Sequence, residues 1–181
     1  MENLQKLLVE RHSIRRYTEQ PVDPDAVKTI LEAALLAPTS KSARPWQFVV
    51  VEDRETLLKL ATCKPVAAHA LKGAAFAVVV MADPERSDMW IEDCAIAAEF
   101  MQLQAAALGV GSCWIQVRNR FDAENQPSAN VVKETLGIPD SLQVECIMSF
   151  GISAENRKPV DLEKLKWEKV HVGRWSDNEA L

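Results

Sequence analysis

The stretch from Asp88 to Leu108, DMWIEDCAIAAEFMQLQAAAL, constrains the fold more than any other part of the sequence. It contains neither proline nor glycine, and apolar side chains occur on nearly every side of a helix drawn through it. A helix of this kind is buried, either in the core of a chain or between subunits. The stretch therefore predicts a long central helix against which the other elements pack.

Other helices are expected on both sides of this stretch. Residues 23–37 carry the clearest signals, because Asp23 is suited to cap a helix, Pro24 to open it and Pro38 to stop it. We expect four more helices, over residues 2–10, 54–63, 65–72 and 128–137, the last of which is ended by Gly137.

Four short apolar runs are typical of buried strands, over residues 46–53, 74–83, 111–117 and 143–152. Helices around such strands predict an α+β sandwich on a mostly antiparallel sheet, and a doubly wound parallel sheet is the alternative. We expect a single domain over residues 1–181. Within it, residues 154–181 are charged, with Trp167 and Trp175 as isolated anchors, and indicate a C-terminal arm that wraps a neighbour.

The composition argues against several classes of protein. A net charge of -5 and a pI near 5.3 disfavour a nucleic-acid-binding surface, which is usually basic. Neither a signal peptide nor a run of about 18 apolar residues is present, so we expect a cytoplasmic protein that does not enter a membrane. The cysteines and histidines are scattered, so we expect buried cysteines and no metal site.

Positive charge gathers in RHSIRRY, residues 11–17. In an extended segment, Arg11, Ser13 and Arg15 would share one side, while Arg16 would point away. Two guanidinium groups and a hydroxyl form a suitable site for a phosphate. The alternative is a solvated basic turn. A second basic pair, Arg157 and Lys158, follows a strand end and could close on the same anion, or could equally be solvated.

The segment PTSKSARPWQF, residues 38–48, joins a helix end to a strand. The hydroxyl groups of Thr39, Ser40 and Ser42 could bond a ring ligand or could merely form turns. Because Arg44 precedes Pro45, we expect its backbone to be extended and its side chain to be presented in a defined direction.

The segment GVGSCWIQVRNR, residues 109–120, contains a G-x-G pair without the third glycine of a dinucleotide fingerprint, and a strand follows it instead of a helix. Gly109 is interpreted as the end of the long helix and Gly111 as the start of the strand. Backbone N–H groups around Trp114, Ile115 and Gln116 could then face a ligand.

The usual markers of hydrolysis and phosphoryl transfer, a G-x-S-x-G elbow and a P-loop, do not occur in the sequence. Glu92 and Asp93 are adjacent on a helix and so face different sides, which excludes a simple carboxylate pair. The remaining interpretation is a site for a phosphorylated ligand with a large apolar part.

Taken together and in this order, these segments resemble the nitroreductase family of FMN-dependent oxidoreductases. The family motif R-x-S-x-R-x-[FY] is matched by Arg11, Ser13, Arg15 and Tyr17, and A-P-[ST]-x-x-N-x-Q-P-W-x-F by APTSKSARPWQF. The short G-x-G turn, the loop FGISAENRKP and the tail WEKVHVGRW are also similar, so that the resemblance spans residues 5–175. Ser42 and Arg44 stand where the family usually has Asn and Gln.

The resemblance implies a homodimer with FMN at the subunit interface and ping-pong transfer of electrons from NAD(P)H to a small organic acceptor, such as a nitroaromatic or a quinone. FMN would carry the chemistry, without a catalytic side chain. The residues that would hold FMN are Arg11, His12, Ser13, Arg15, Trp114, Ile115, Gln116, Arg157 and Lys158 of one subunit, with Pro38, Thr39, Ser40, Ser42 and Arg44 reaching the flavin of the other. The alternatives are dehalogenation or flavin destruction on the same fold, a flavin carrier without turnover, and a Rossmann-like protein without flavin.

Overall fold

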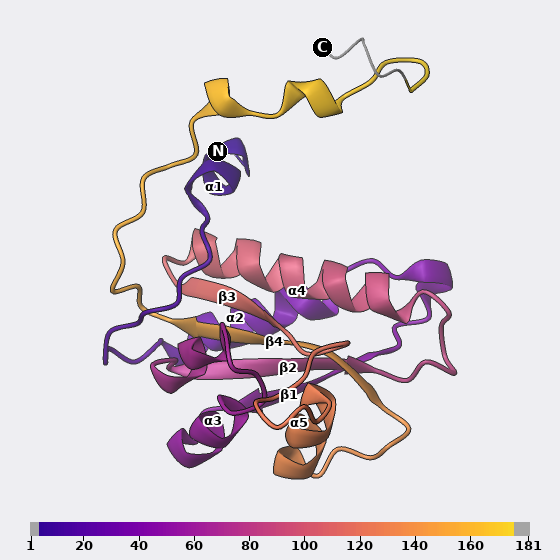
Figure 1. The fold of residues 1–181 in the computed structure, drawn as a ribbon. Coiled ribbons are helices and arrows are strands. Elements are labelled where there is room, and N and C mark those ends of the chain that lie inside the picture. The colour runs from indigo at the N-terminus through magenta and orange to yellow at the C-terminus, as the bar shows by residue number, and fades with distance from the viewer. Residues whose placement is uncertain (1–3, 176–181) are drawn as a thin grey trace.

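A computed structural model describes residues 4–175 of the chain (Figure 1). Its helices are α1 (Leu4–Glu10), α2 (Pro24–Leu35), α3 (Arg54–Leu60), α4 (Trp90–Ala107) and α5 (Ser128–Leu136). Its strands are β1 (Trp46–Val51), β2 (Phe76–Ala82), β3 (Gly111–Gln116) and β4 (Gln143–Gly151). Short 3₁₀ turns occur at Ser40–Ser42, Ala68–Lys72, Leu162–Lys164 and Trp167–Lys169.

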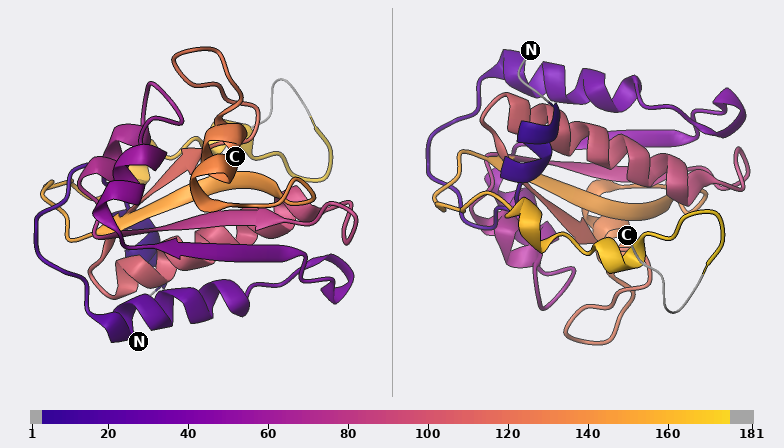
Figure 2. Two further views of the ribbon diagram at one scale, coloured as in Figure 1. Left: turned by 90° about the horizontal axis from the view of Figure 1, so that it is seen from below. Right: turned by 90° about the horizontal axis from the view of Figure 1, so that it is seen from above.

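The strands form one sheet in the order β1-β2-β4-β3, and every neighbouring pair is antiparallel. Helices α2 and α4 cover one face of this sheet and α3 and α5 cover the other, as the views from below and above show (Figure 2). The predicted α+β class is therefore confirmed, and the doubly wound parallel alternative is wrong.

The two faces of the sheet bury separate apolar clusters because side chains alternate along each strand. In β2, Val78 and Val80 pack toward α2 and α4, whereas Val79 packs toward α3 and α5. All seven residues of β2 are buried, since this strand lies inside the sheet with helices on both faces. The predicted buried strand at 74–83 is confirmed.

The long helix α4 packs one side of its surface into the chain and leaves another side open. Ala97, Ala98 and Met101 are fully buried, while Ile96 and Phe100 each keep 38% of their surface exposed. An apolar helix side that the chain itself does not cover is suited to an interface between subunits. Gly109, with φ of 72°, follows the helix end as predicted.

The sequence predictions for two elements need correction. Strand β1 is not buried, because it lies at the edge of the sheet; Gln47 and Val50 are exposed and only Val51 is buried. Residues 65–72 do not form a continuous helix, because only Ala68–Lys72 are helical and as a 3₁₀ turn. By contrast, the Asp23 cap is confirmed, since its Oδ1 accepts the Asp25 N–H at 2.8 Å.

The C-terminal arm leaves the body of the molecule after β4 and runs past α1 (Figure 1). Its backbone is tied to α1 by the Val160 N–H, which donates to the Val9 carbonyl at 2.9 Å. Trp167 and Trp175 keep 52% and 70% of their surface exposed, so within the described chain they anchor nothing. Across residues 4–175, no helix has the length and apolar character needed to cross a membrane.

Two glycines allow the N-terminal segment to lie close to the sheet. A Cβ on Gly151 would come within 2.9 Å of the Tyr17 ring, and a Cβ on Gly111 within 3.1 Å of Ile14. Tyr17 has little freedom to move away, because its hydroxyl bonds the Ile14 carbonyl at 2.7 Å and the Ser149 Oγ at 2.8 Å. This burial raises the pKa of the Tyr17 phenol well above its ordinary value.

We predict that Gly151→Ala lowers the free energy of unfolding by about 1–3 kcal/mol, the usual cost of overpacking. Gly73→Ala is the matched control, since its Cβ would lie 3.9 Å from the same tyrosine, at ordinary contact distance. Urea unfolding at one fixed protein concentration measures both variants. Equal losses of stability in the two variants would contradict the proposed close contact.

Candidate functional site

The RHSIRRY segment lies beside the start of β3. Ser13 forms a parallel bridge with Ser112, and the Ile14 N–H donates to the Ser112 carbonyl at 2.8 Å. Further along, the Thr18 N–H donates to the Ile152 carbonyl at 2.8 Å. The segment is therefore fixed between the start of β3 and the residues that follow β4.

Glu155 joins this segment to the loop after β4. Its Oε1 accepts the backbone N–H groups of Arg15 and Arg16, both at 2.9 Å, and its Oε2 accepts from Nε of Arg157 at 2.8 Å. The backbone N–H of Arg15, followed by the Arg157 guanidinium and the Arg16 N–H, lowers the pKa of the Glu155 carboxyl below its ordinary value. One carboxylate thus holds both predicted basic segments together.

A cavity of about 250 Å³ opens where these segments meet. Of the predicted residues, it is lined by Arg11, His12 and Arg157, and it also includes Ser153 and Asn156, which sequence reasoning missed. Both missed residues lie in the quoted loop GISAENRKP, so their position directly after a strand end was the available signal.

Three other predicted residues do not line this cavity: Ser13, Arg15 and Lys158. Nη1 of Arg15 instead donates to the Ser13 carbonyl at 3.3 Å, and Lys158 is exposed. Arg16 points away as predicted, with 78% of its side chain exposed.

The chemistry of this cavity suits an anion. Its guanidinium groups offer forked donors, and His12 contributes an Nε2 that is buried and has no hydrogen-bond partner in the described part of the chain. An unpaired buried polar atom is costly, and a ligand oxygen would satisfy it. The carboxylate of Glu155, which also borders the cavity, already accepts three hydrogen bonds.

Strand β3 offers a row of backbone groups beside this cavity. It is the last strand of the sheet, and its Ser112 carbonyl points outward to meet Ile14. Because backbone directions alternate, the N–H groups of Trp114 and Gln116 point to the same outer edge. Ile115, also predicted to face a ligand, does not present its N–H group at this edge. Its side chain is fully buried and its backbone faces β4.

A polar network fixes the side chains along this strand. Trp114 Nε1 donates to Gln116 Oε1 at 2.9 Å, and Gln116 Nε2 donates to Glu145 Oε1 at 3.0 Å. Glu145 is buried in a bulge of β4 and is paired with Arg118 at 2.6 Å. The network holds the β3 edge in one arrangement.

The loop 38–44 lies at the opposite end of the sheet. At one end of the sheet, which we call the Arg11 end, strands β1 and β4 end and strands β2 and β3 begin. Loop 38–44 precedes the start of β1 and therefore lies at the other end, which we call the Ser40 end. The six residues of β1 separate the two ends by roughly 17 Å, at about 3.4 Å per residue. Within one chain, the two predicted halves of the site do not meet.

The conformation of loop 38–44 differs from the prediction at Arg44. We expected an extended backbone before Pro45, but φ of Arg44 is 46°, in the left-handed region. Thr39 accounts for this turn in part, because its Oγ1 accepts the Arg44 N–H at 3.1 Å. Pro38, Ser42 and Arg44 are exposed, whereas Thr39 and Ser40 are half-buried.

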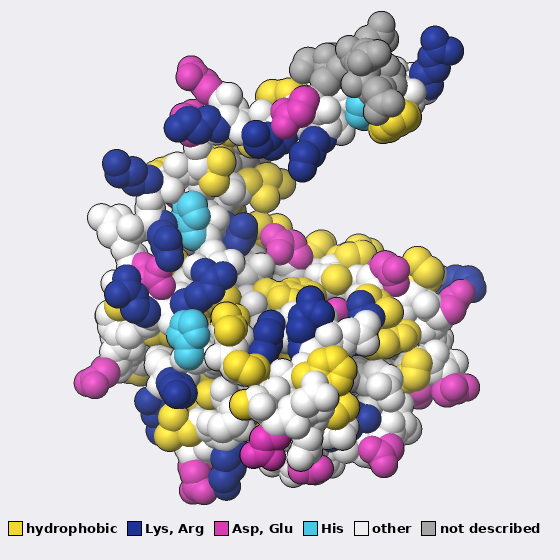
Figure 3. Space-filling view, in the orientation of Figure 1, with side chains coloured by type: hydrophobic (Ala, Val, Ile, Leu, Met, Phe, Trp, Pro, Cys, Tyr) yellow, Lys and Arg dark blue, Asp and Glu magenta, His cyan; other side chains and the backbone are white. Residues whose placement is uncertain are grey.

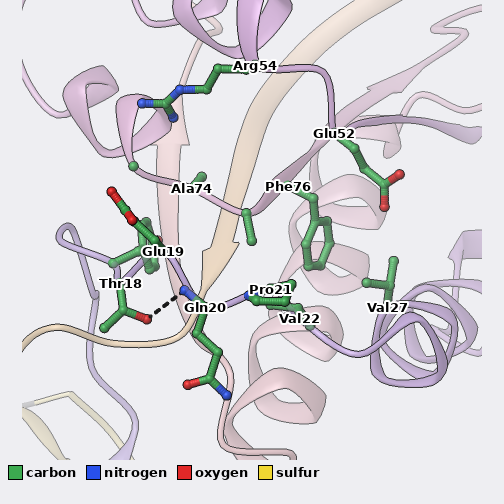
Figure 4. Close-up of a pocket in the computed structure, with 13 residues that line it drawn as sticks. Thr18, Glu19, Gln20, Pro21, Val22, Val27, Glu52, Arg54, Ala74 and Phe76 are labelled. Carbon is green, nitrogen blue, oxygen red and sulfur yellow. Dashed lines mark hydrogen bonds between the residues drawn. The ribbon is translucent and has the colours of Figure 1, made fainter.

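A larger cavity of about 610 Å³ has Tyr17 in its lining and contains none of the residues of the cavity at the Arg11 end (Figure 4). Its lining includes Glu19, Glu52 and Arg54 around the Phe76 ring, and none of the residues predicted to hold a cofactor. Its charges are of both signs and its walls combine polar and apolar groups. The cavity therefore does not single out a ligand by its chemistry.

The four cysteines are buried and free, which confirms their predicted place in the core. Burial raises the pKa of Cys63 to about 11 and that of Cys94 to about 12, so both thiols stay protonated at neutral pH.

Over the residues that the structure describes, no group of three His, Cys, Asp or Glu side chains is placed to hold a metal ion.

Comparison with known proteins gives matches over nearly the whole chain. The sequence model described as "Nitroreductase family" matches residues 8–64 and 58–152. A relative from Archaeoglobus fulgidus, named "Putative NADH dehydrogenase/NAD(P)H nitroreductase", is 33% identical over 180 residues, or 97% of this chain and 100% of the relative.

Solved structures give the same result. An "FMN-dependent Nitroreductase" from Clostridium difficile R20291 is 44% identical, with a TM-score of 0.92 over 94% of this chain and 99% of that one. A "putative nitroreductase in complex with fmn" from Desulfovibrio desulfuricans is 26% identical, with a TM-score of 0.74 over 94% of this chain and 99% of that one.

We predict that the stabilising effect of Glu155 is lost in acid. Because its folded pKa is lowered, the carboxylate contributes stability above the ordinary value of 4.5, and this contribution falls as the pH drops through the lower folded value. Glu155→Gln should therefore cost about 1 kcal/mol at pH 7, and less as the pH approaches 3. Urea unfolding of both proteins over this pH range measures the difference.

The control for this experiment is Glu134→Gln, at an exposed position of α5. This variant should follow the wild-type protein at every pH. A difference between wild type and Glu155→Gln that stays constant from pH 7 to pH 3 would contradict the role given to the Glu155 charge.

Proposed function

The chain belongs to the nitroreductase family, and we propose that it binds FMN and passes electrons from NAD(P)H to a small organic acceptor, such as a nitroaromatic or a quinone. The observation that carries this proposal is the cavity at the Arg11 end, where Arg11, His12 and Arg157 meet beside the open edge of β3. Similarity to proteins described as FMN-dependent, or as a complex with FMN, supports the same cofactor.

The residues present fit FMN by their chemistry. Arg11, Arg157 and the unpaired Nε2 of His12 would bind the phosphate. Of the two carboxylates that line the cavity, Glu155 is already hydrogen-bonded and Glu10 is exposed. Backbone N–H groups of Trp114 and Gln116 would donate to the polar edge of the flavin ring. When bound, FMN supplies the redox chemistry, by accepting a hydride from the nicotinamide and giving two electrons to the acceptor.

The protein's own part in the reaction is to bind, to orient and to stabilise charge. Fixed backbone N–H donors along β3 would hold the ring in one orientation and would stabilise negative charge that develops on it without reorganisation. The reaction then needs no acid–base pair of side chains. Glu92 and Asp93 do not form one, because Glu92 is exposed and Asp93 is buried on α4.

We propose that two subunits build each site. Because the Arg11 end and the Ser40 end of one chain lie at opposite ends of the sheet, a single FMN can contact RHSIRRY of one subunit and loop 38–44 only of another. Exposed apolar residues on α4 and on the arm support an interface. Figure 3 shows hydrophobic side chains along the hollow between the arm and the body, which a second subunit could fill.

We expect purified protein, reconstituted with FMN, to show flavin absorbance that bleaches on anaerobic addition of NADH or NADPH and returns when a nitroaromatic or a quinone is added. Initial rates should give parallel lines in double-reciprocal plots, as a ping-pong reaction requires. Bound FMN that neither nucleotide reduces would indicate a carrier instead. Protein that binds no FMN would refute the proposal.

Arg11→Ala should weaken FMN binding roughly 10- to 150-fold, because a charge-assisted contact of about 1.5–3 kcal/mol is lost. Fluorescence titration of the apoprotein with FMN gives the dissociation constant. Arg16→Ala is the matched control, since this neighbouring side chain is 78% exposed and outside the cavity. Equal affinities of the two variants would show that the cavity holds something else.

A further inference from the structure

We infer that Asp93, near the start of α4, is a positioning residue for the flavin site, which it serves by holding loop 39–44 in the conformation presented to the partner subunit. This inference rests on the proposed function, in which that loop contacts FMN. The contacts of Asp93, the strain in the loop and the scarcity of other anchors support it separately.

Asp93 is a buried carboxylate whose hydrogen bonds point toward the loop. Only 2% of the residue is exposed. Its Oδ1 accepts the backbone N–H of Ser40 at 2.8 Å, and its Oδ2 accepts the hydroxyl of Ser87 at 3.2 Å. Ser87 Oγ in turn accepts the Met89 N–H at 3.2 Å, which ties the same group to the start of α4.

A buried charge without an ion-pair partner needs an explanation, because its desolvation is costly. No ion pair of Asp93 occurs among residues 4–175, so its two hydrogen bonds and the positive end of the α4 dipole stabilise the charge. The adjacent Glu92 has the same charge on the same turn, yet it is exposed. Interaction with the helix dipole alone therefore does not explain why Asp93 is buried, whereas its hydrogen bond to Ser40 in the loop does.

The loop that Asp93 contacts has a strained backbone. Lys41, Ser42 and Arg44 have φ of 50°, 55° and 46°, in the left-handed region that residues other than glycine rarely adopt. Such conformations persist only where surrounding contacts impose them, and they gather at functional sites. An external anchor is thus required to keep this loop in place.

Few contacts other than the one to Asp93 could impose this conformation. Within the described chain, the hydrogen bond from Ser40 N–H to Asp93 is the one that joins loop 39–44 to another element. The ion pair of Lys41 with Asp88, at 3.9 Å, is 83% and 80% exposed, and such exposed pairs contribute little. The buried carboxylate of Asp93 is therefore the main anchor of the loop.

Trypsin reports on this loop directly, without FMN or activity. Lys41 is a cleavage site inside the loop, whereas Arg44 is protected by Pro45. Loss of a charge-assisted bond should raise the open population about tenfold, so Asp93→Ala should be cut between residues 41 and 42 about ten times faster than wild type. Asp93→Asn, which can still accept from Ser40 and donate to Ser87, should stay within about threefold of wild type. Glu92→Ala, one residue away, should leave the cleavage rate unchanged.

FMN affinity tests the functional half of the inference. Asp93→Ala should bind FMN about tenfold more weakly than wild type, with affinity restored in Asp93→Asn and unchanged in Glu92→Ala. Circular dichroism and sedimentation check that each variant is folded and has the wild-type subunit number. If Asp93→Ala does not fold, Ser87→Ala is used instead; it removes the hydrogen bond that orients the Asp93 carboxylate and leaves the bond to Ser40, so we expect smaller changes in the same directions.

The outcomes separate the inference from the proposed function. Faster cleavage of Asp93→Ala together with weaker FMN binding supports the inference. Wild-type cleavage in Asp93→Ala would show that the carboxylate does not hold the loop, and faster cleavage with unchanged FMN affinity would show that the loop does not serve the flavin; each overturns the inference. Wild-type protein that binds no FMN would instead refute the proposed function.

Discussion

The antiparallel pairing of β4 with both of its neighbours decides which segments of this chain can meet. Because β4 runs between β2 and β3, its last residues bring the loop after Gly151 beside the start of β3, where RHSIRRY adds itself to the sheet edge. The antiparallel pairing of β1 with β2 places loop 38–44, which precedes β1, at the far end of the sheet. The two segments proposed to bind FMN, which we call half-sites, therefore lie at opposite ends of the sheet in one chain, and the proposal of a two-subunit site follows from this register.

A carboxylate organises each half-site without being placed to react. At the Arg11 end, Glu155 binds the backbone of Arg15 and Arg16 as well as the Arg157 side chain, so that two cationic segments can lie together. At the Ser40 end, Asp93 binds the backbone of the hydroxyl-rich loop. In both places, the carboxylate accepts backbone N–H groups of the segment that it holds.

Local patterns in the sequence predicted most of the elements, and contacts between distant residues account for the differences. The Asp23 cap and the β2 run depend on neighbours along the chain, and both were confirmed. The exposure of β1 depends on its place at the sheet edge, which its own apolar run does not encode. Likewise, the positive φ of Arg44 accompanies hydrogen bonds of the loop to Thr39 and Asp93, which the local Arg-Pro sequence does not encode.

The two half-sites also differ in how firmly they are built. RHSIRRY is held by a bridge to β3, by the close packing of Tyr17 on Gly151 and by two backbone hydrogen bonds to Glu155. Loop 39–44 is strained and has one buried anchor. In the proposed site, the firmly held segment would keep the phosphate of FMN bound while the weakly held loop moves and admits small substrates.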